Sequence, residues 1–312
     1  MPQPAAAGAF VMAIKIEMLR CFQAVVDHGR LSDAAAALGR TPSAVSMTLK
    51  QLEDHIGAPL FETSRKSRLS TLGEQVYQEA LLALAHFERS LATIDSLSRS
   101  QAGYVRLAVT PSVAAMILPP IIQAFLADHP GVRIEMHDMT SAAVQRDLQN
   151  ERADIGLASI PPTEGLARKP LFRDPFGVVC RADTPLARAG LPLTWEAIAR
   201  EEFITNGLCA QITDPQFQPV LLGARLEVPN TASLLALIRA GVGVTVLPRL
   251  AVPEDIADLV FLPLPDATIQ REVWMVTSDR IRPTPVVRDF AKAILQAAAS
   301  DLRGHSDFSF SE

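Results

Sequence analysis

The sequence predicts an α/β protein with an all-α N-terminal part. Three observations predict it: amphipathic helical segments fill roughly the first 60 residues, an uninterrupted heptad pattern follows, and strand-like and helical segments alternate after Gly103. The chain has 312 residues, of which 48% are hydrophobic and 20% are charged. Such a chain is long enough for two or three domains and has the composition of a soluble folded protein.

Residues 31–53 carry the most informative local pattern, which is two short amphipathic helices joined by a tight turn. Thr41 is expected to cap the second helix, with Pro42 in its first turn and Gly57 at its end. Steps of four, three and four residues give this helix one apolar stripe. The stripe consists of Val45, Leu49, Leu52 and Ile56.

Two further helices and a wing surround this pattern. We expect a helix over residues 14–30 and another from the cap Ser32 through Leu38, before the turn at Gly39. Residues 58–73, APLFETSRKSRLSTLG, place apolar side chains around a basic tip, which predicts a two-stranded wing. The apolar residues are Leu60, Phe61 and Leu69.

The side of the second helix opposite the apolar stripe is small and polar, which suits insertion into a DNA major groove. The candidate DNA-contacting residues are Thr41, Ser43, Ser46, Met47, Thr48 and Lys50 on the helix, and Arg65, Lys66 and Arg68 on the wing. Lys50 and the wing residues are expected to meet phosphates. The alternative for the helix residues is plain capping, and for the basic residues a solvated surface.

Charge supports this interpretation only weakly. Residues 1–72 contain eight Lys and Arg against six Asp and Glu, whereas the whole chain has a net charge of −5. The chain is therefore not a general nucleic-acid coat, and the helix pattern carries the prediction.

Residues 73–97 contain no proline and carry a heptad seam, which predicts a long helix that pairs with a second copy. The alternative is a helix that lies on the body of its own chain. Residues 98–103 are expected to form a hinge. The seam consists of Tyr77, Ala80, Leu84, Phe87, Leu91 and Ile94.

Beyond Gly103 the order is strand, helix, strand, helix, strand, and a second unit follows. Short loops in this order predict a parallel sheet covered by helices. The predicted strands are 105–110, 132–138, 153–159, 176–182, 202–205, 244–248 and 271–278. The first predicted helix ends at residue 127, and the others span residues 142–150, 194–200, 231–240 and 284–302.

These segments, in this order from Ile14 to Leu302, resemble the LysR-type transcriptional regulators. The resemblance rests on SAVS followed by LKQLE, GAPLFE and RLSTLGE, and continues in LPPIIQAFLADHPGV, LQNERADIGLA and LLALIRAGVGVTVLPRLA. It implies a winged helix-turn-helix, a linker helix, and two α/β lobes like those of periplasmic binding proteins. The implied boundaries are 14–72 for the DNA-binding domain, 73–99 for the dimerisation helix and 104–302 for the effector-binding domain, with lobe I at about 104–174 plus 273–302 and lobe II at about 175–272.

Two positions depart from the family pattern. Members often have Gln before the recognition core and Arg after its serine, where this chain has Pro42 and Met47. Neither residue can make the usual bidentate base contacts, and Met47 is expected to touch a thymine methyl group instead.

The resemblance also implies a small-molecule effector between the lobes. Residues at strand ends and helix starts suit such a ligand, because free N–H groups and the positive helix end favour an acceptor or anion. The candidates are Thr110, Ser112, Thr140, Ser141, Thr205, Thr231 and Ser233. Plain capping is the alternative for each. No arginine joins the set, which favours a small organic acid with one carboxylate, or a neutral polar molecule.

Cys209 supports an alternative function, that of a thiol-based redox regulator, because it falls near the reactive cysteine of peroxide-sensing family members. The segment 210–222 lacks the second thiol that a disulfide switch needs. Three widely spaced cysteines, Cys21, Cys180 and Cys209, suit a reducing cytoplasm. An apolar N-terminus without basic residues is a poor secretory signal, and either Met1 or Met12 could be the start.

The sequence thus predicts a cytoplasmic transcription factor with no membrane span and no cofactor besides a co-inducer. The six histidines lack metal-ligand spacing, and no catalytic constellation supports an enzyme such as a hydrolase or dehydrogenase. A solute-binding protein would need export. The expected partners are promoter DNA, a small-molecule effector, further copies in a homodimer or homotetramer, and RNA polymerase if the output is activation.

Overall fold

The computed structural model describes residues 13–62, 68–98, 103–188, 193–253, 258–264, 266 and 268–300. The chain divides into two compact units, Met1–Ile94 and Asp95–Glu312. Each unit has its own hydrophobic core. Within the described ranges, no helix combines the length and the apolar character needed to cross a membrane.

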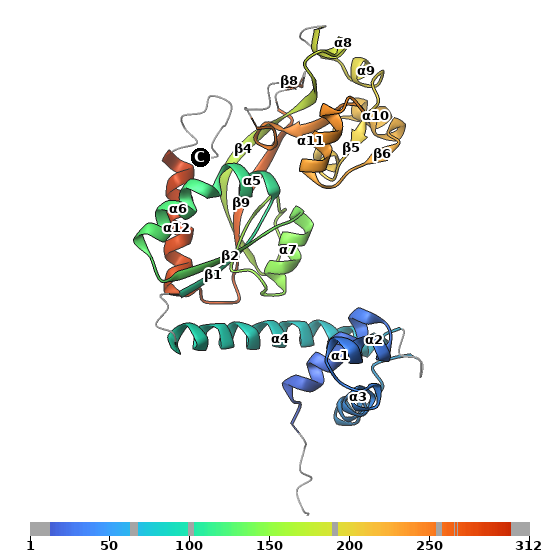
Figure 1. Ribbon diagram of the computed structural model, residues 1–312, viewed down its shortest axis with the longest axis vertical. Coiled ribbons are helices and arrows are strands. Elements are labelled where there is room, and N and C mark those ends of the chain that lie inside the picture. The colour runs from blue at the N-terminus through green and yellow to red at the C-terminus, as the bar shows by residue number, and fades with distance from the viewer. Residues whose placement is uncertain are drawn as a thin grey trace, which may run out of the picture. The chain divides into compact units, whose positions relative to one another are not determined.

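The N-terminal unit is built from α1 (Ile16–His28), α2 (Leu31–Ala37), α3 (Pro42–Ile56) and the first part of α4 (Thr71–Ser98) (Figure 1). The predicted stripe of α3 is confirmed, because Val45, Leu49 and Leu52 are fully buried and Ile56 is half-buried against the same core. They pack against Phe22 of α1, whose ring meets that of Phe61 edge-on at 5.7 Å.

Local hydrogen bonds set the ends of α3. Thr41 caps the helix as predicted, since its hydroxyl accepts the N–H of Ala44 at 3.3 Å. Gly57 ends it in a left-handed conformation, with φ of 81°, and donates its N–H to the carbonyl of Glu53.

Several predicted helix starts differ from the structure by one or two residues, and those of α2 and α4 show why. The helix α2 begins at Leu31, and the Ser32 hydroxyl binds Asp33 instead of capping it. The helix α4 begins at Thr71, because the Ser70 hydroxyl accepts the N–H of Gly73 and so caps an earlier turn.

The base of the predicted wing is present as one antiparallel bridge between Phe61 and Leu69. Glu62 donates its N–H to the carbonyl of Arg68 at 3.0 Å across this bridge. The tip, and with it Arg65 and Lys66, lies outside the described residues.

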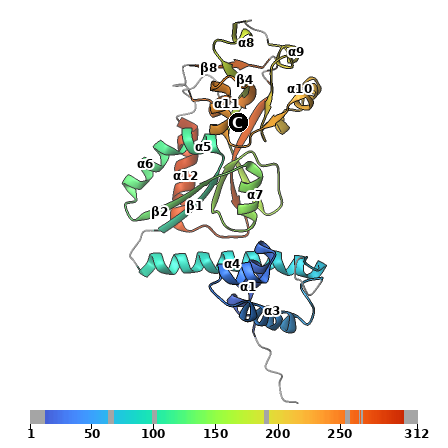
Figure 2. The ribbon, with the colours of Figure 1, turned by 45° about the vertical axis from the view of Figure 1, so that its right-hand side comes forward.

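The first lobe of the C-terminal unit is an α/β sandwich (Figures 1 and 2). Its strands are β1 (Gly103–Val109), β2 (Val132–Asp138), β3 (Ile155–Ala158) and β9 (Gln270–Ser278), in the order β2-β1-β3-β9. The parallel pairing predicted for the first three strands is confirmed. The sheet is nevertheless mixed, because β9 returns antiparallel to β3.

Side chains of β1 alternate between two helical layers. Val105, Leu107 and Val109 share a core with α6 (Leu118–Asp128) and α12 (Pro285–Ser300). On the opposite face, Ala108 packs with buried side chains of α7 (Ser141–Gln149). This period of two is the physical reason that helices cover both faces of the sheet.

The helix predicted to follow the first strand and reach residue 127 is two helices, α5 (Pro111–Met116) and α6. The break falls at Ile117 because Pro119 and Pro120 lack the N–H groups that a continuous helix would need. Both prolines lie at the start of α6, where that loss costs little.

Strand β4 (Leu166–Arg181) joins the two lobes and was predicted only from residue 176 onward. It pairs antiparallel with β9 as far as Pro175. From Phe176 it pairs with β7 (Thr245–Pro248), and from Gly177 with β8 (Leu259–Pro263), in the second lobe. The long strands β4 and β9 are therefore the connection between the lobes (Figure 1).

The second lobe packs short helices around these strands. Its remaining elements are α8 (Pro185–Arg188), α9 (Trp195–Ile198), β5 (Ile204–Thr205), η1 (Cys209–Gln211), η2 (Pro215–Phe217), α10 (Gln218–Gly223), β6 (Leu226–Glu227), α11 (Thr231–Arg239) and η3 (Arg249–Ala251). Trp195, Phe203 and Phe217 form its aromatic centre.

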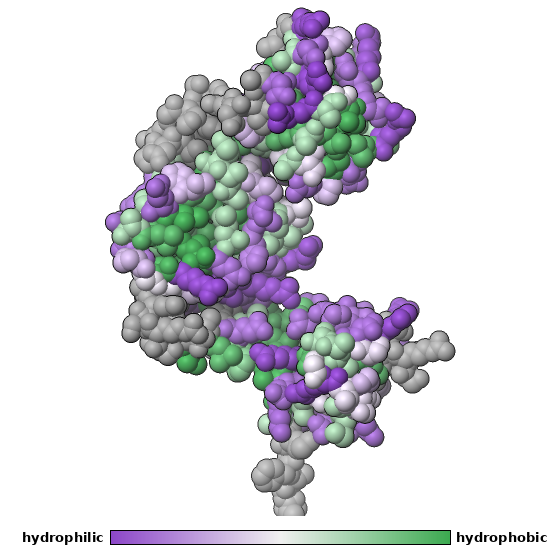
Figure 3. Space-filling model, viewed as in Figure 1, coloured by the Kyte–Doolittle hydropathy of each residue, from purple (hydrophilic) through white to green (hydrophobic). Residues whose placement is uncertain are grey.

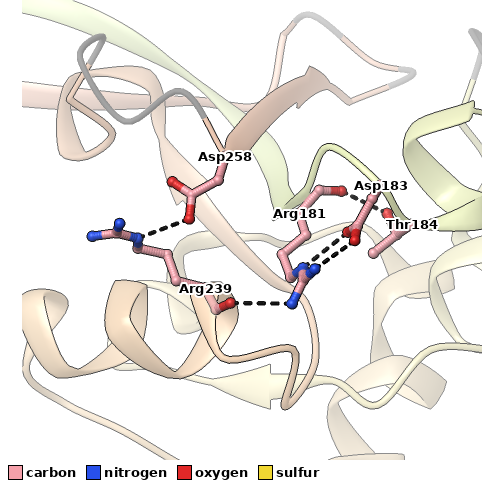
Figure 4. Close-up of polar contacts among 5 residues, drawn as sticks. All are labelled: Arg181, Asp183, Thr184, Arg239 and Asp258. Carbon is pink, nitrogen blue, oxygen red and sulfur yellow. Dashed lines mark hydrogen bonds and ion pairs between the residues drawn. The ribbon is translucent and has the colours of Figure 1, made fainter.

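An ion-pair cluster ties the C-terminal end of α11 to β4 and to the start of β8 (Figure 4). Arg181 donates to both oxygens of Asp183 and to the carbonyl of Arg239, and Arg239 in turn donates to Asp258 at 3.0 Å. Hydrogen bonds from these arginines lower the pKa values of Asp183 and Asp258. A guanidinium at a helix C-terminus also favours the helix dipole.

We predict that Arg181→Gln lowers the melting temperature at pH 7 by about 1 to 3 °C, because α11 loses its clamp. The two carboxylates have folded pKa values below their unfolded ones, so their contribution is present above about pH 4 and is lost as the pH falls through the folded values. The difference between variant and wild type should therefore shrink below about pH 4, as measured by circular dichroism.

Arg200→Gln is the matched control, because among the described residues the Arg200 side chain binds only the exposed Glu196, four residues earlier. If the melting temperature of Arg181→Gln differs from that of wild type by the same amount at pH 3 and at pH 7, the role given to Asp183 and Asp258 is contradicted.

Candidate functional site

The exposed side of α3 carries most of the residues predicted to contact DNA. Ser43, Met47 and Lys50 are exposed, and Ser46 is half-buried at the flank. Met47 keeps 63% of its surface accessible, so its side chain is available for contacts outside its own unit. This side of α3 does not pack into the core of its own unit.

Thr48 lies apart from this face. At about 100° per residue it sits roughly 140° around the helix from Ser43. Its hydroxyl donates to the carbonyl of Ala44 at 2.9 Å, and it is half-buried. This geometry favours a helix-internal bond for Thr48.

Two exposed residues on the same ridge were missed by the sequence interpretation. Gln51 and Asp54 follow Met47 by four and seven residues, the spacing that keeps side chains on one helix face. That spacing was the signal that could have found them. Ser46, Lys50 and Asp54 also line a shallow groove of about 570 Å³ beside Pro59.

The described part of the wing presents Arg68, whose side chain is 79% exposed and lies 3.3 Å from the Glu62 carboxylate. In water, an exposed ion pair of this kind is weak, so the Glu62 carboxylate compensates the charge of Arg68 only in part.

The predicted seam of α4 divides into two parts. Its N-terminal part packs within the unit: the Tyr77 hydroxyl donates to Asp27 of α1 at 2.5 Å, and Ala80 belongs to the core. Phe87 lies under the guanidinium of Arg20, also on α1. Leu91 and Ile94 are exposed, at 42% and 58%.

In the first lobe, the candidate ligand residues converge at the carboxyl ends of β1, β2 and β3. Thr110 donates its N–H to the carbonyl of Leu157, and the Ser141 hydroxyl accepts the N–H of Ser159. Thr140 caps α7 by accepting the N–H of Ala143 at 3.4 Å.

Ser112 belongs to a buried polar network that the sequence interpretation missed. Arg271 on β9 donates one N–H to the Ser112 hydroxyl at 2.9 Å and another to Asp174 on β4 at 2.5 Å. The other oxygen of Asp174 accepts the N–H of Leu250 in η3 at 3.1 Å. The expectation that no arginine joins the candidate ligand residues is therefore wrong.

Burial governs the electrostatics of this network. The side chains of Arg271 and Asp174 are 1% and 0% exposed. Burial raises the pKa of the Asp174 carboxyl, and the adjoining guanidinium opposes that rise. A buried charge is costly unless an opposite charge lies beside it. An Arg in one predicted buried strand and an Asp next to another was therefore the signal that could have predicted this ion pair.

Two polar atoms beside the network have no hydrogen-bond partner among the described residues. They are the Thr110 hydroxyl oxygen and Nε of Arg271. Both side chains are more than nine-tenths buried. Buried polar atoms left without partners are uncommon in folded proteins and call for an explanation.

In the second lobe, Asn230 rather than Thr231 caps α11, accepting the N–H of Ser233 at 3.0 Å. Thr205 accepts the N–H of Val228 through its carbonyl. The side chains of Thr205, Thr231 and Ser233 make no hydrogen bond to any residue that the structure describes, so their hydroxyl groups are free for a ligand. Among the described residues, no hydrogen bond connects these three side chains to the candidate ligand residues of the first lobe.

Cys209 lies in η1 with only 2% of its surface exposed. Burial raises the pKa of its thiol to about 11. A neighbouring buried asparagine, Asn206, accepts and donates four hydrogen bonds around this loop and holds Cys209 inward. A thiol in such surroundings is a poor nucleophile.

Metal binding finds no support in the described residues, where no three His, Cys, Asp or Glu side chains are grouped to hold an ion.

Two family models match the chain over the regions built above. Residues 16–74 match the model described as bacterial regulatory helix-turn-helix protein, lysR family, and residues 98–299 match the LysR substrate binding domain. The second match alone spans more than half of the chain.

Individual proteins agree with these matches. The chain is 30% identical to LrrA, a probable HTH-type transcriptional regulator of Synechococcus elongatus, over 78% of this chain and 85% of that protein. It is also 30% identical to a probable hydrogen peroxide-inducible genes activator of Streptomyces viridosporus, over 76% and 78% respectively.

The fold is shared with the full-length regulator CbnR solved in complex with its target DNA. That structure aligns with a TM-score of 0.64 at 17% identity, covering 91% of this chain and 100% of the other. With a helix-turn-helix unit, a two-lobed α/β unit and relatives of this kind, the chain belongs to the LysR family of DNA-binding transcriptional regulators.

Proposed function

We propose that this chain is a ligand-responsive regulator that reads promoter DNA with α3 and binds a small polar molecule between the lobes of its C-terminal unit. The observation that supports the DNA-binding part of the proposal is the exposed polar ridge of α3, which lies opposite the buried apolar stripe of the same helix. The chain acts as a regulator and not as an enzyme in this proposal.

The base-reading contacts come from the first two turns of α3. Ser43 and Ser46 have short polar side chains that allow close approach to base edges, and the exposed Met47 suits a thymine methyl group. Lys50, with Arg68 on the wing, supplies affinity through phosphates without sequence information.

A ligand alters the regulator only if it binds one lobe geometry better than another. Candidate contacts lie at strand ends of the first lobe and around α11 of the second. Because the Arg271 charge is compensated by Asp174, a monoacid or a neutral polar molecule fits this site better than a dianion.

Self-association completes the proposal, because two recognition helices are needed for two half-sites in successive major grooves. The exposed Leu91 and Ile94 extend the seam of α4 beyond the part used in its own unit. A second apolar area lies over α6 and the edge strand β2 (Figure 3), where Ile122, Leu126 and Met136 line a groove of about 730 Å³. Two separate surfaces would support a dimer of dimers.

The redox alternative rests on Cys209 and on the peroxide-related relative. The burial of this thiol and its raised pKa oppose it. The ligand-responsive function is therefore preferred.

We predict that Ser46→Glu abolishes sequence-specific binding, because a carboxylate on this face repels the DNA phosphates and fills the space needed by a base edge. Footprinting on the upstream region of the gene measures the loss, and the melting temperature should stay within about 2 °C of wild type. Thr213→Glu, an exposed change in the second lobe, is the control for added charge. A retained footprint would remove α3 from the DNA interface.

Lys50→Gln should weaken binding to specific and random DNA by similar factors, because a phosphate contact carries no sequence information. The slope of log affinity against log salt concentration should become shallower by about 0.9 for each protomer that loses the contact. Fluorescence anisotropy over a range of salt concentrations checks this. An unchanged slope would place Lys50 away from the backbone.

For the ligand site, we expect small monocarboxylates from acetate to hexanoate to raise the melting temperature of the full chain. The rise should be lost in Ser112→Ala and kept in Cys209→Ser. Loss in Cys209→Ser together with a response to hydrogen peroxide would support the redox alternative instead.

A further inference from the structure

The pairing of β4 with β9 changes register at Leu171, next to the crossover between the lobes. Before this point Pro170 faces Trp274, and after it Phe172 faces Val273. One extra residue is thus accommodated on β4, which is the definition of a β-bulge.

The bulge decides which charges face each other. Beyond it, Asp174 faces Arg271 on the buried side and Arg173 faces Glu272 on the exposed side, with the latter ion pair at 2.9 Å. Without the register change Arg173 would face Arg271, and a buried guanidinium would meet a like charge. The bulge and the two ion pairs therefore require each other.

The buried pair also reaches the candidate ligand site. Arg271 presents a rigid fork of donors, of which one N–H binds Asp174 and another binds the Ser112 hydroxyl. Since the Ser112 oxygen accepts from Arg271, its own proton is free to be donated elsewhere. Nε of Arg271, buried and without a partner among the described residues, is a second donor at the same place.

We infer that Arg271 is a positioning residue of the ligand site: held by Asp174 in the register that the bulge sets, it fixes Ser112 as a hydrogen-bond donor, so the ligand atom bound there is an acceptor such as a carboxylate or carbonyl oxygen. The inference about the ligand rests on the proposed function, whereas the positioning of Ser112 does not.

Hydrogen exchange of the full chain tests the positioning. The N–H groups of Val113 and Ala114 both bind the Thr110 carbonyl in the first turn of α5, and they report on that turn. In Arg271→Lys, the ammonium keeps a charge for Asp174 but lacks the planar fork whose two nitrogens bind Asp174 and Ser112 at the same time. These two amides should exchange about 10-fold faster or more, because a charge-assisted hydrogen bond is lost.

Two internal controls locate the effect. The Leu250 amide, bound by Asp174, should stay within about twofold of its wild-type exchange rate, because that carboxylate keeps a cationic partner. The Val144 amide, in the first turn of α7 and bound by the Thr140 carbonyl, should not change. Unchanged exchange at Val113 and Ala114 would overturn the inference.

A double variant separates positioning from stability. Replacing a buried ion pair with apolar residues restores stability that either single change removes. Asp174→Leu with Arg271→Met should therefore melt higher than Asp174→Leu alone, while Val113 and Ala114 remain fast to exchange. Protection that returns together with stability would show a merely structural role.

The polarity of the ligand is tested with acetate and ethylammonium, two probes of similar size. Acetate should raise the melting temperature of wild type and not that of Arg271→Lys. Any change that ethylammonium causes in the melting temperature should be the same in wild type and in Ser112→Ala. An ethylammonium shift lost in Ser112→Ala would overturn the assigned polarity. If neither acetate nor the longer acids raise the melting temperature, the proposed ligand site is contradicted. The hydrogen-exchange rates of Val113 and Ala114 would still test whether Arg271 positions Ser112.

Discussion

The buried ion pair between Asp174 and Arg271 is the constraint on which the C-terminal unit depends. It lies where β4 and β9 pass from one lobe to the other, and it also binds the first turn of α5 and the start of η3. Removing one member of such a pair typically costs about 3 to 5 kcal/mol, because the other charge stays buried without compensation. The crossover strands are therefore held in one register by electrostatics as well as by packing.

The DNA-binding unit depends on a different constraint, the separation of one small helix into two faces. Burial of Val45, Leu49 and Leu52 anchors α3 to the core of its unit. The residues of the opposite ridge are therefore not needed for packing in the core, so they can be selected for contacts with DNA. Met47 illustrates the consequence, because an exposed methionine contributes little to the stability of an isolated unit.

Sequence patterns predicted much of this molecule wherever the determining interactions are local. The stripe of α3, the Thr41 cap and the parallel strands of the first lobe follow from periodicity and capping chemistry within a few residues. Helix starts at α2 and α4 were placed less well. The helix α2 begins without a side-chain cap because the Ser32 hydroxyl binds Asp33, and α4 begins before the predicted residue because Ser70 caps it.

By itself, then, the sequence determined the parallel strands of the first lobe, the two-sided recognition helix and the family, because each depends on spacing along the chain. The tertiary structure decided what depends on residues far apart. It brought together Ser112, Asp174 and Arg271, extended β4 through Pro170 and Pro175, and turned Cys209 inward. No local pattern encodes which strand an isolated charge will face, since strand pairing is settled only when distant segments pack.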